Sequence, residues 1–551
     1  MTAVMPTALR PARRRPDVVL HQPGSSQEPW VAELPEGRYV RIGPDVGRLL
    51  GVVDGDADVS ALAERLGAPW TAAIVETTLG RLGAAGLLDV DVAAGTPVRP
   101  PAAAPRRLQF VAPASVQLTV VNPAAWMDRH RPLVSALSGR AGAAVFLALG
   151  AAGLLALAAS APTVVASLSS PLSLGTAAVV FATIMAVTSL HEVGHAAALA
   201  RHGGRPRRMG IMLFYLSPAL FCDVSDGWLL PERQARVRVA IAGVVVQGGC
   251  AGLMALGAVL VTGPWHGPLI VVATACYAAG AFNLLPLVKF DGYIALMSAL
   301  DIPYLRAKAM SDWRRALAHA LFGGQRGEPA LPGRRWAPWY GLACAVMPLV
   351  LVGATSWNLL AALASWGRPG AVLRLAGVLV LVVLLARSFV RVAATAPAGG
   401  AQRVRVVMVS LLIPAAALAA AAALPFTPTV RAGYWVAPDG GAHLVVASGD
   451  EARAIVPGQA VQLQSQGLVL RSSVGRARVV AAGPPRRVPF SALVPFIRTG
   501  VETQARTFAL STPQWSAPHD ATGAATVGTQ NTSFLDWIGR QVTDPWRTLT
   551  W

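Results

Sequence analysis

The chain has 551 residues, of which 54% are hydrophobic and only 14% charged, and its formal net charge is +19. This apolar content exceeds that of a soluble protein and indicates several membrane spans. The basic residues, almost all Arg, flank apolar stretches and do not gather in one polar region, which argues against a nucleic-acid-binding protein. The four Cys residues show no CxxC spacing, which disfavours a disulfide framework or a Cys-type zinc site.

The N-terminal part predicts a tail followed by a small soluble domain. Residues 1–28 are rich in Pro and Arg, lack the apolar segment of a signal peptide and are expected to be disordered. Residues 29–95 contain two short extended runs, Trp30–Leu34 and Arg38–Ile42, and then apolar residues at helical spacing. Three helices are expected to begin near Pro44, Asp58 and Trp70.

The middle of the chain predicts a polytopic membrane protein. About seven apolar segments have the length that a bilayer requires, roughly 20 residues each. They lie near 143–160, 173–200, 237–261, 268–288, 340–364, 371–393 and 405–424. Arg-rich loops alternate with loops that carry almost no charge, so the basic loops and the N-terminus are expected in the cytoplasm. An odd number of spans places the C-terminal part outside the cell membrane.

Outside the spans, several segments predict strands and turns. Residues 107–121 alternate like a strand, and residues 211–220, too short to span, predict a re-entrant hairpin. The C-terminal sequence predicts strands at 443–447, 460–463 and 468–472, with turns at 438–441 and 457–458. Beyond residue 510 it predicts a loop, followed by a short amphipathic helix over 534–542.

The predicted fold is therefore a mainly α-helical membrane protein with a small N-terminal α+β domain and a C-terminal β-rich domain. Its parts are a tail (1–28), the α+β domain (29–95), a linker with membrane-proximal strands (96–142), a membrane core (143–300), a basic cytoplasmic loop (301–337), accessory membrane helices (338–425) and an extracytoplasmic β-rich domain (426–551).

Near the end of the second predicted span lies an HExxH motif, formed by His191, Glu192 and His195. Residues four apart share a helix face, so both imidazoles can bind one zinc ion and the glutamate can reach the water on it. Ionisable residues inside an apolar span indicate function by default. The alternative is a helix end whose polar groups bond to water and loops, and five matching residues alone leave that alternative open.

A second motif closes the fourth predicted span, with Asn283, Pro286, Asp291 and Gly292. A catalytic zinc takes three protein ligands and keeps one open position. The predicted orientation brings the end of this span to the same side of the membrane as the HExxH helix, so Asp291 is a candidate third ligand. The alternatives are a helix-end cap for Asp291 and a buried amide for Asn283.

HExxH together with NxxPxxxxDG, on two membrane helices, resembles the site-2 protease family of intramembrane zinc metalloproteases, over roughly 173–300. The resemblance implies zinc ligands His191, His195 and Asp291, a general base Glu192, and a substrate-binding Asn283. The sequence from Asn283 to Gly292 and Tyr293 is most similar to the branch of this family found in bacterial peptide-maturation clusters. The sequence lacks the inserted PDZ domain of the signalling proteases, which argues against a stress-signalling role.

The two flanking domains resemble known modules. Residues 30–95 are similar to the small winged-helix element that recognises leader peptides in ribosomal-peptide biosynthesis, where the peptide adds as a strand. These residues contain five Arg and ten Asp or Glu, a net charge of −5, which disfavours the DNA-binding alternative. The tail around 456–461 resembles the barrel of secretion adaptor proteins, as many small β-domains do.

Each of three further polar residues has two interpretations, a role at the metal site or an ordinary structural role. His202 is a possible extra ligand, although a solvated loop position fits it better. Asp223 and Asp226 are candidates for lining a water path to the zinc, or are turn formers.

These features predict a zinc metalloendopeptidase that removes the leader from a ribosomally made peptide precursor. Its expected partners are the precursor, the lipid bilayer, and secretion or biosynthesis proteins, with no nucleic acid. The alternatives are regulated intramembrane proteolysis of a membrane-anchored signalling protein, and a peptide exporter or immunity protein with a non-catalytic metal site. The substrate, the cleavage site and the oligomeric state are not predicted.

Overall fold

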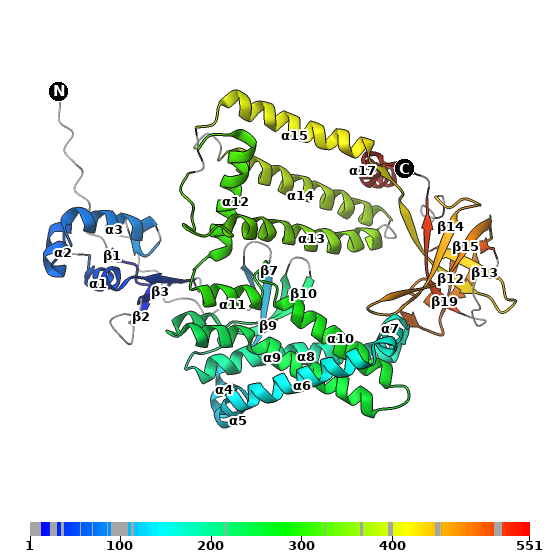
Figure 1. Ribbon diagram of the computed structural model, residues 1–551, viewed down its shortest axis with the longest axis horizontal. Helices are drawn as coiled ribbons and strands as arrows, with labels where there is room; N and C mark the ends of the chain where they lie inside the picture. The colour runs from blue at the N-terminus through cyan, green and yellow to red at the C-terminus, as the bar shows by residue number, and fades with distance from the viewer. Residues whose placement is uncertain are drawn as a thin grey trace. The chain divides into compact units, whose positions relative to one another are not determined.

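The structure is a computed structural model of the chain (Figure 1). It describes residues 13–21, 30–34, 38–55, 57–68, 70–84, 86–89, 108–111, 115–214, 217–325, 327–363, 367–394, 400–446, 452, 454–511, 521–529 and 531–550. The chain divides into two compact units. The first comprises residues 1–138, 195–214 and 218–240, and the second comprises residues 139–194, 215–217 and 241–551. Helices α8 (Leu174–Arg201) and α9 (Arg233–Leu260) contribute to both.

The first unit begins with an α+β domain. A three-stranded antiparallel sheet and three helices form it: β2 (Val19–His21), β3 (Trp30–Leu34), β4 (Arg38–Ile42), α1 (Pro44–Val52), α2 (Val59–Leu66) and α3 (Ala72–Ala84). The predicted strands and helices are confirmed. Disorder throughout 1–28 is wrong for residues 13–21, because β2 pairs with β3 and β1 (Arg13–Arg14) pairs with β5 (Leu88–Asp89).

The core of this domain follows from the apolar pattern of its helices. Leu49, Leu50, Leu62 and Val75 are buried together, and each such burial stabilises a fold by roughly 1.5–3 kcal/mol. Asp58 begins α2 by accepting a hydrogen bond from the amide of Ala61 at 2.7 Å, the usual role of a helix N-cap.

A four-stranded sheet of order β10-β9-β7-β6 also belongs to the first unit. Its strands are β6 (Leu108–Val111), β7 (Ser115–Val121), β9 (Met209–Phe214) and β10 (Ser217–Cys222). The single strand predicted over 107–121 is instead two paired strands, and the hairpin predicted over 211–220 is β9 and β10. Short helices α4 (Ala124–Arg129) and α5 (Arg131–Leu137) and the turn η1 (Ser225–Leu229) complete this part. Residues 96–107 of the segment predicted as a linker with membrane-proximal strands (96–142) lie outside the described residues.

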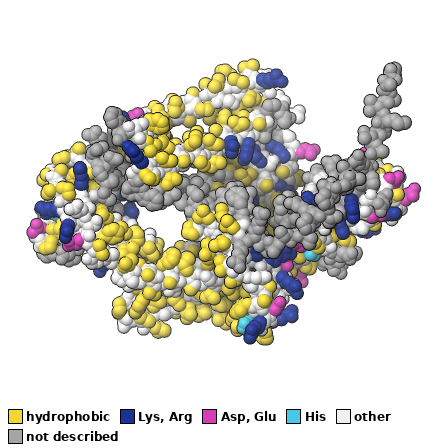
Figure 2. All heavy atoms as spheres, turned by 180° about the vertical axis from the view of Figure 1, so that it is seen from behind, with side chains coloured by type: hydrophobic (Ala, Val, Ile, Leu, Met, Phe, Trp, Pro, Cys, Tyr) yellow, Lys and Arg dark blue, Asp and Glu magenta, His cyan; other side chains and the backbone are white. Residues whose placement is uncertain are grey.

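Most of the second unit is apolar helix. Besides α8 and α9 it contains α6 (Arg140–Ala159), α7 (Ala161–Ser169), α10 (His266–Asn283), α11 (Asp291–Leu300), α12 (Leu305–Phe322), α13 (Ala337–Leu363), α14 (Gly367–Ala393) and α15 (Arg403–Ala423). Within the described residues, five helices are long and apolar enough to cross a membrane: α6, α8, α9, α14 and α15. Helices α10 and α13 stand where the other two spans are predicted, and the count of seven stays a prediction. Apolar side chains cover much of the described part of the face that Figure 2 shows.

Small residues let α6 approach α9 closely. A Cβ atom on Gly153 would collide with Gly252, and one on Gly249 would collide with Phe146. Such glycine contacts are how helices pack in lipid, where van der Waals contact between backbones replaces the hydrophobic effect.

The C-terminal part is an antiparallel β-domain, as predicted. Its main strands are β12 (Thr429–Val436), β13 (Ala442–Val446), β14 (Ala460–Gln466), β15 (Arg471–Ala482), β16 (Arg486–Pro489), β18 (Glu502–Leu510) and β19 (Thr522–Gly528). Their order is β13-β12-β19-β14-β15-β18-β16, and β13 also pairs with β18, which closes a barrel around Leu444, Leu463 and Val527. Two predictions are wrong here. Strand β19 lies in a segment that the sequence predicts to be a loop, and the strand expected at 468–472 begins only at Arg471.

The barrel is joined to the beginning of α8. Strand β17 (Ile497–Arg498) pairs with β8 (Leu172–Ser173), and the amide of Leu470 donates to the carbonyl of Leu168 at 3.0 Å. His191 lies 17 residues beyond Leu174, the first residue of α8, which is about 26 Å at the helical rise. The HExxH motif therefore begins about 26 Å along the helix from the end that contacts the barrel.

Candidate metal centre

The HExxH motif lies in the second half of α8, and its two histidines are buried. The His191 side chain is 2% exposed and His195 is 5% exposed. Gly194 lets α9 come close, because a Cβ atom at this position would lie 3.0 Å from Val246 and 3.1 Å from the carbonyl oxygen of Ala242. A buried imidazole needs a polar partner, so these two side chains must find one inside the helix bundle.

His195 has a partner that fixes its tautomer. Its Nδ1 lies 2.8 Å from the backbone carbonyl oxygen of Val239. A carbonyl can only accept, so Nδ1 carries the hydrogen and donates it. The Nε2 atom then keeps its lone pair, which is the arrangement seen in histidine ligands whose second nitrogen donates to a carbonyl.

Asp291 comes to His191 from a different helix. It is the first residue of α11, and its Oδ2 lies 3.0 Å from Nε2 of His191. The positive end of the helix dipole favours a carboxylate at this position. Ligand atoms of His191, His195 and Asp291 all lie within 4.8 Å of one another, and no other such group is found within the described part of the chain.

This donor set fits zinc. Two imidazole nitrogens and one carboxylate oxygen are among the known ligand sets of catalytic zinc. Ligand atoms at about 2.05 Å from a tetrahedral ion lie about 3.3 Å apart, and the separation of 3.0 Å between His191 Nε2 and Asp291 Oδ2 is close to that value. Three ligands leave the fourth position of a tetrahedral site for water or substrate.

The turn that carries Asp291 is held by close packing and by hydrogen bonds. A Cβ atom on Gly292 would collide with the carbonyl oxygen of Leu284, so this position accepts only glycine without a shift of the backbone. Tyr340 donates to the carbonyl of Pro286, and Arg306 donates to the carbonyl of Leu287 at 3.3 Å. Sequence reasoning does not identify Val239, Tyr340 or Arg306 as supports, because each of these hydrogen bonds joins residues distant in the chain and its acceptor is a backbone carbonyl.

The remaining predicted site residues lie on α8, just after it, and at the end of α10. Glu192 follows His191 on α8 and is half-buried, and Asn283 is the last residue of α10 and is also half-buried. His202 lies just past the end of α8, outside the ligand group.

Comparisons with protein-family models, with characterised proteins and with solved structures find no match. The chemistry of the site is therefore argued from these residues and their geometry.

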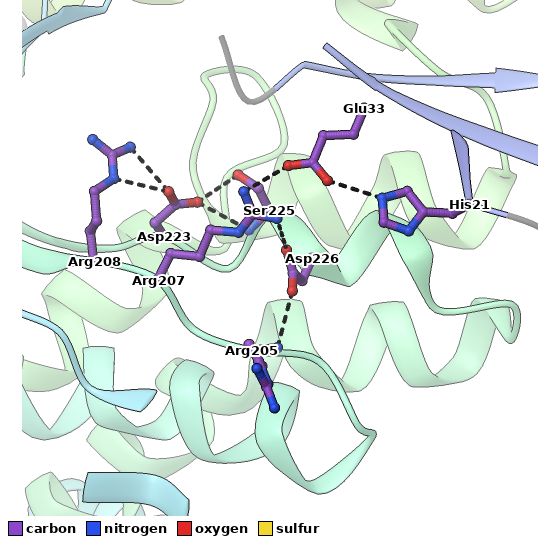
Figure 3. A network of polar contacts seen from close by, with 8 residues as sticks. All are labelled: His21, Glu33, Arg205, Arg207, Arg208, Asp223, Ser225 and Asp226. Carbon is purple, nitrogen blue, oxygen red and sulfur yellow. Dashed lines mark hydrogen bonds and ion pairs between the residues drawn. The ribbon is translucent and has the colours of Figure 1, made fainter. Parts of the chain in front are cut away.

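The loop that follows α8 is held by a network of ion pairs (Figure 3). Arg207 lies 2.7 Å from Oε1 of Glu33 on β3 and 3.0 Å from Oδ1 of Asp226, while Arg208 lies 3.0 Å from Oδ2 of Asp223. Asp226 also accepts a hydrogen bond from the amide of Arg205. The structure thus shows Asp223 and Asp226 holding the loop in shape.

Glu33 is the point where the N-terminal domain meets this loop. Burial alone would raise the pKa of Glu33, but hydrogen bonds and charge from Arg207 and His21 outweigh it and hold the pKa below its usual value. His21 contributes through its Nε2 atom, 3.0 Å from Oε2 of the same carboxylate. Glu33 is therefore expected to be ionised near neutral pH, with one partner in its own domain and one in the loop after α8.

Proposed function

We propose that this protein is a membrane-embedded zinc metalloendopeptidase of the site-2 protease type. The observation that carries the proposal is the convergence of His191, His195 and Asp291, whose ligand atoms lie within 4.8 Å of one another although Asp291 is 100 residues from His191. Burial supports it, because a buried imidazole nitrogen without a partner costs free energy, and a metal ion that accepts the lone pairs of His191 and His195 would remove that cost.

The residues of the chain would share the chemistry of peptide hydrolysis. A bound zinc ion supplies a Lewis acid that polarises a carbonyl and lowers the pKa of water to ~7. Glu192, between the two histidines, would take a proton from the attacking water and give it to the nitrogen of the leaving amine. Asn283 would hold the substrate backbone through its amide, and the hydrogen bond from His195 to Val239 would keep that imidazole oriented.

The proposed substrate is a ribosomally made peptide precursor, recruited by the domain over 29–95, which we interpret as a winged-helix type recognition element. In the sheet order β2-β3-β4, the outer strands β2 and β4 have edges to which an extended peptide can add. The contact between Glu33 and Arg207 supports the proposal, because it joins this domain to the loop directly after the HExxH helix.

The proposed topology places the N-terminus in the cytoplasm and the barrel outside, with seven spans. The Arg-rich loops support the orientation. The barrel contacts the beginning of α8, about 26 Å along the helix from His191. This spacing supports a barrel and a metal centre near opposite faces of the membrane. Reporter fusions at residues 100 and 500 should report opposite compartments, and fusions that report the same compartment contradict the topology.

The experiment that tests the proposed activity is the Glu192→Gln substitution. It keeps the shape of the side chain but removes the base, so the variant should retain its zinc and fail to cleave. Peptides encoded by neighbouring genes, analysed by mass spectrometry in cells with either form, provide the substrates. Cleavage by the variant at the normal rate contradicts the mechanism. Zinc retention without any cleavage by the unaltered protein favours a non-catalytic metal site, and cleavage of a transmembrane helix favours regulated proteolysis of a signalling protein.

The recruiting role has its own test. Deleting residues 1–95 should slow processing of dilute precursor, because tethering raises the effective substrate concentration to ~mM. Zinc content should stay unchanged, and concentrated precursor should restore much of the rate. If the shortened protein processes dilute precursor at the full rate, the domain does not recruit the substrate.

A further inference from the structure

Helix α17 (Phe534–Thr550) is amphipathic along its whole length. Its charged residues lie along one side, at positions 536, 540, 544 and 547. At 3.6 residues per turn, its large apolar residues fall on the other side: Phe534, Leu535, Ile538, Val542, Trp546 and Leu549. The sequence predicts only the first half of this helix and leaves its role open.

One side of α17 packs against protein where α15 ends. Strand β11 (Pro425–Phe426), directly after α15, pairs with β20 (Thr532–Ser533), directly before α17. The amide of Phe534 donates to the carbonyl of Leu424 at 3.0 Å. The rings of Phe534 and Trp537 stack, and the ring of Phe426 packs against both at an angle. Figure 1 shows α17 at the ends of α14 and α15, and it packs against both helices.

A second apolar side of α17 is partly exposed among the residues that the structure describes. Ile538 and Val542 are each 41% exposed and Trp546 is 61% exposed. These three residues are four apart and form one stripe. A soluble helix would turn such a stripe toward a core, so its exposure indicates a partner of apolar character.

The neighbouring helices indicate which partner it is. Helices α14 and α15 are both long and apolar enough to cross a membrane, and none of the described side chains of α15 is buried. The stripe on α17 therefore begins beside a surface that faces acyl chains when α15 spans the bilayer. Tryptophan is enriched at the boundary between acyl chains and headgroups, which suits Trp537 and Trp546.

We propose that α17 is an interfacial helix that lies in the membrane surface where α15 ends, with Ile538, Val542 and Trp546 inserted among the lipids. Its charged side faces the headgroups and water. That side carries Asp536, Asp544, Arg540 and Arg547, so its formal charge is zero and insertion depends on apolar contact, without a requirement for anionic lipid. The chain leaves the barrel after β19 and returns to the membrane through this helix.

The test measures the depth of single labels on the full chain in lipid nanodiscs. The four native cysteines are replaced by alanine, and an environment-sensitive fluorophore is attached to Val542→Cys or Trp546→Cys. The matched control is Arg540→Cys, one turn away from the charged residue at 544 on the polar side. Quenching by spin-labelled phosphatidylcholine reports contact with lipid, and quenching by iodide reports contact with water.

The labels at 542 and 546 should be quenched several-fold more by the lipid quencher than the label at 540, and the label at 540 more by iodide. The same pattern should hold in nanodiscs with and without anionic lipid. Equal quenching by iodide at 540 and 542 overturns the proposal. So does a label at 542 that neither quencher reaches, which would show that another protein surface covers the stripe, and so does a pattern that appears only with anionic lipid.

Discussion

Arg207 joins the N-terminal domain to the loop after α8, and its replacement by methionine tests that connection. Methionine keeps much of the apolar stem and removes the guanidinium group. Arg207 lies 2.7 Å from Glu33, whose side chain is 14% exposed, whereas the Arg207 side chain is 43% exposed. Hydrogen bonds to charged groups contribute about 1.5–3 kcal/mol when buried, and exposed ion pairs only ~0–1 kcal/mol. Since solvent screens this guanidinium, the interaction is expected to contribute about 1 kcal/mol, a factor of about 5 in a local opening equilibrium.

Hydrogen exchange at the amides of β3 measures this equilibrium. The Arg207→Met variant should exchange about 5-fold faster there, and a double-mutant cycle with Glu33→Gln should isolate the interaction. The matched control is Arg208→Met, which removes a neighbouring guanidinium that pairs with Asp223 and not with Glu33. Unchanged exchange in Arg207→Met, or the same acceleration in Arg208→Met, refutes the reasoning.

The same pair predicts a dependence on pH. The pKa of folded Glu33 is held below its usual value, so the contribution is fully present above the ordinary glutamate pKa of about 4.3 and is lost as the pH falls through the lower folded value. The coupling from the double-mutant cycle should therefore disappear on acidification and stay constant near neutral pH.

Two further variants probe the metal centre and the barrel. Gly292→Ala should reduce bound zinc, measured by elemental analysis, because its Cβ atom would collide with the carbonyl of Leu284 and shift Asp291. The control is Gly175→Ala, whose Cβ atom meets nothing within 4 Å. Equal zinc in both variants contradicts the role of the turn. Leu463→Ala should destabilise the barrel by ~2–5 kcal/mol, measured by proteolysis of the C-terminal part, because Leu463 is fully buried in the barrel core. Zinc should stay bound, because His191 lies about 26 Å along α8 from the end that contacts the barrel, and a parallel loss of zinc argues against that separation.

The long apolar helices and the short β-rich strands of this chain are predictable from its sequence. Apolar stretches of bilayer length stand where α6, α8, α9, α14 and α15 form, and the helix of the HExxH motif extends to Arg201 as its pattern indicates. Trp30–Leu34 and Arg38–Ile42 are strands with the predicted bounds, because short β-rich runs between turn residues carry a clear local signal. The candidate ligands His191 and His195 are indicated by motif spacing, and Asp291 by the second motif and the family resemblance; the structure brings these three residues together.

The missed features depend on partners that are distant in the chain. The strand Thr522–Gly528 consists of small residues without alternation and forms only because β12 and β14 pair with it on both sides. Residues 13–14 and 19–21 become strands by pairing with β5 and β3. Arg207 and Glu33 are 174 residues apart, so neither sequence neighbourhood indicates the other. In each case tertiary contacts override a weak local preference.

The most direct test of the central claim is the zinc content of the purified full chain, measured by elemental analysis together with X-ray absorption at the zinc edge. The account predicts about one zinc per chain, bound by two histidine nitrogens and a carboxylate oxygen. His195→Ala and Asp291→Ala should each lose most of this metal, while the matched control His202→Ala, which alters the next histidine along the chain, should keep it. A protein without zinc after metal-replete expression, or full retention of zinc in His195→Ala, would contradict the account.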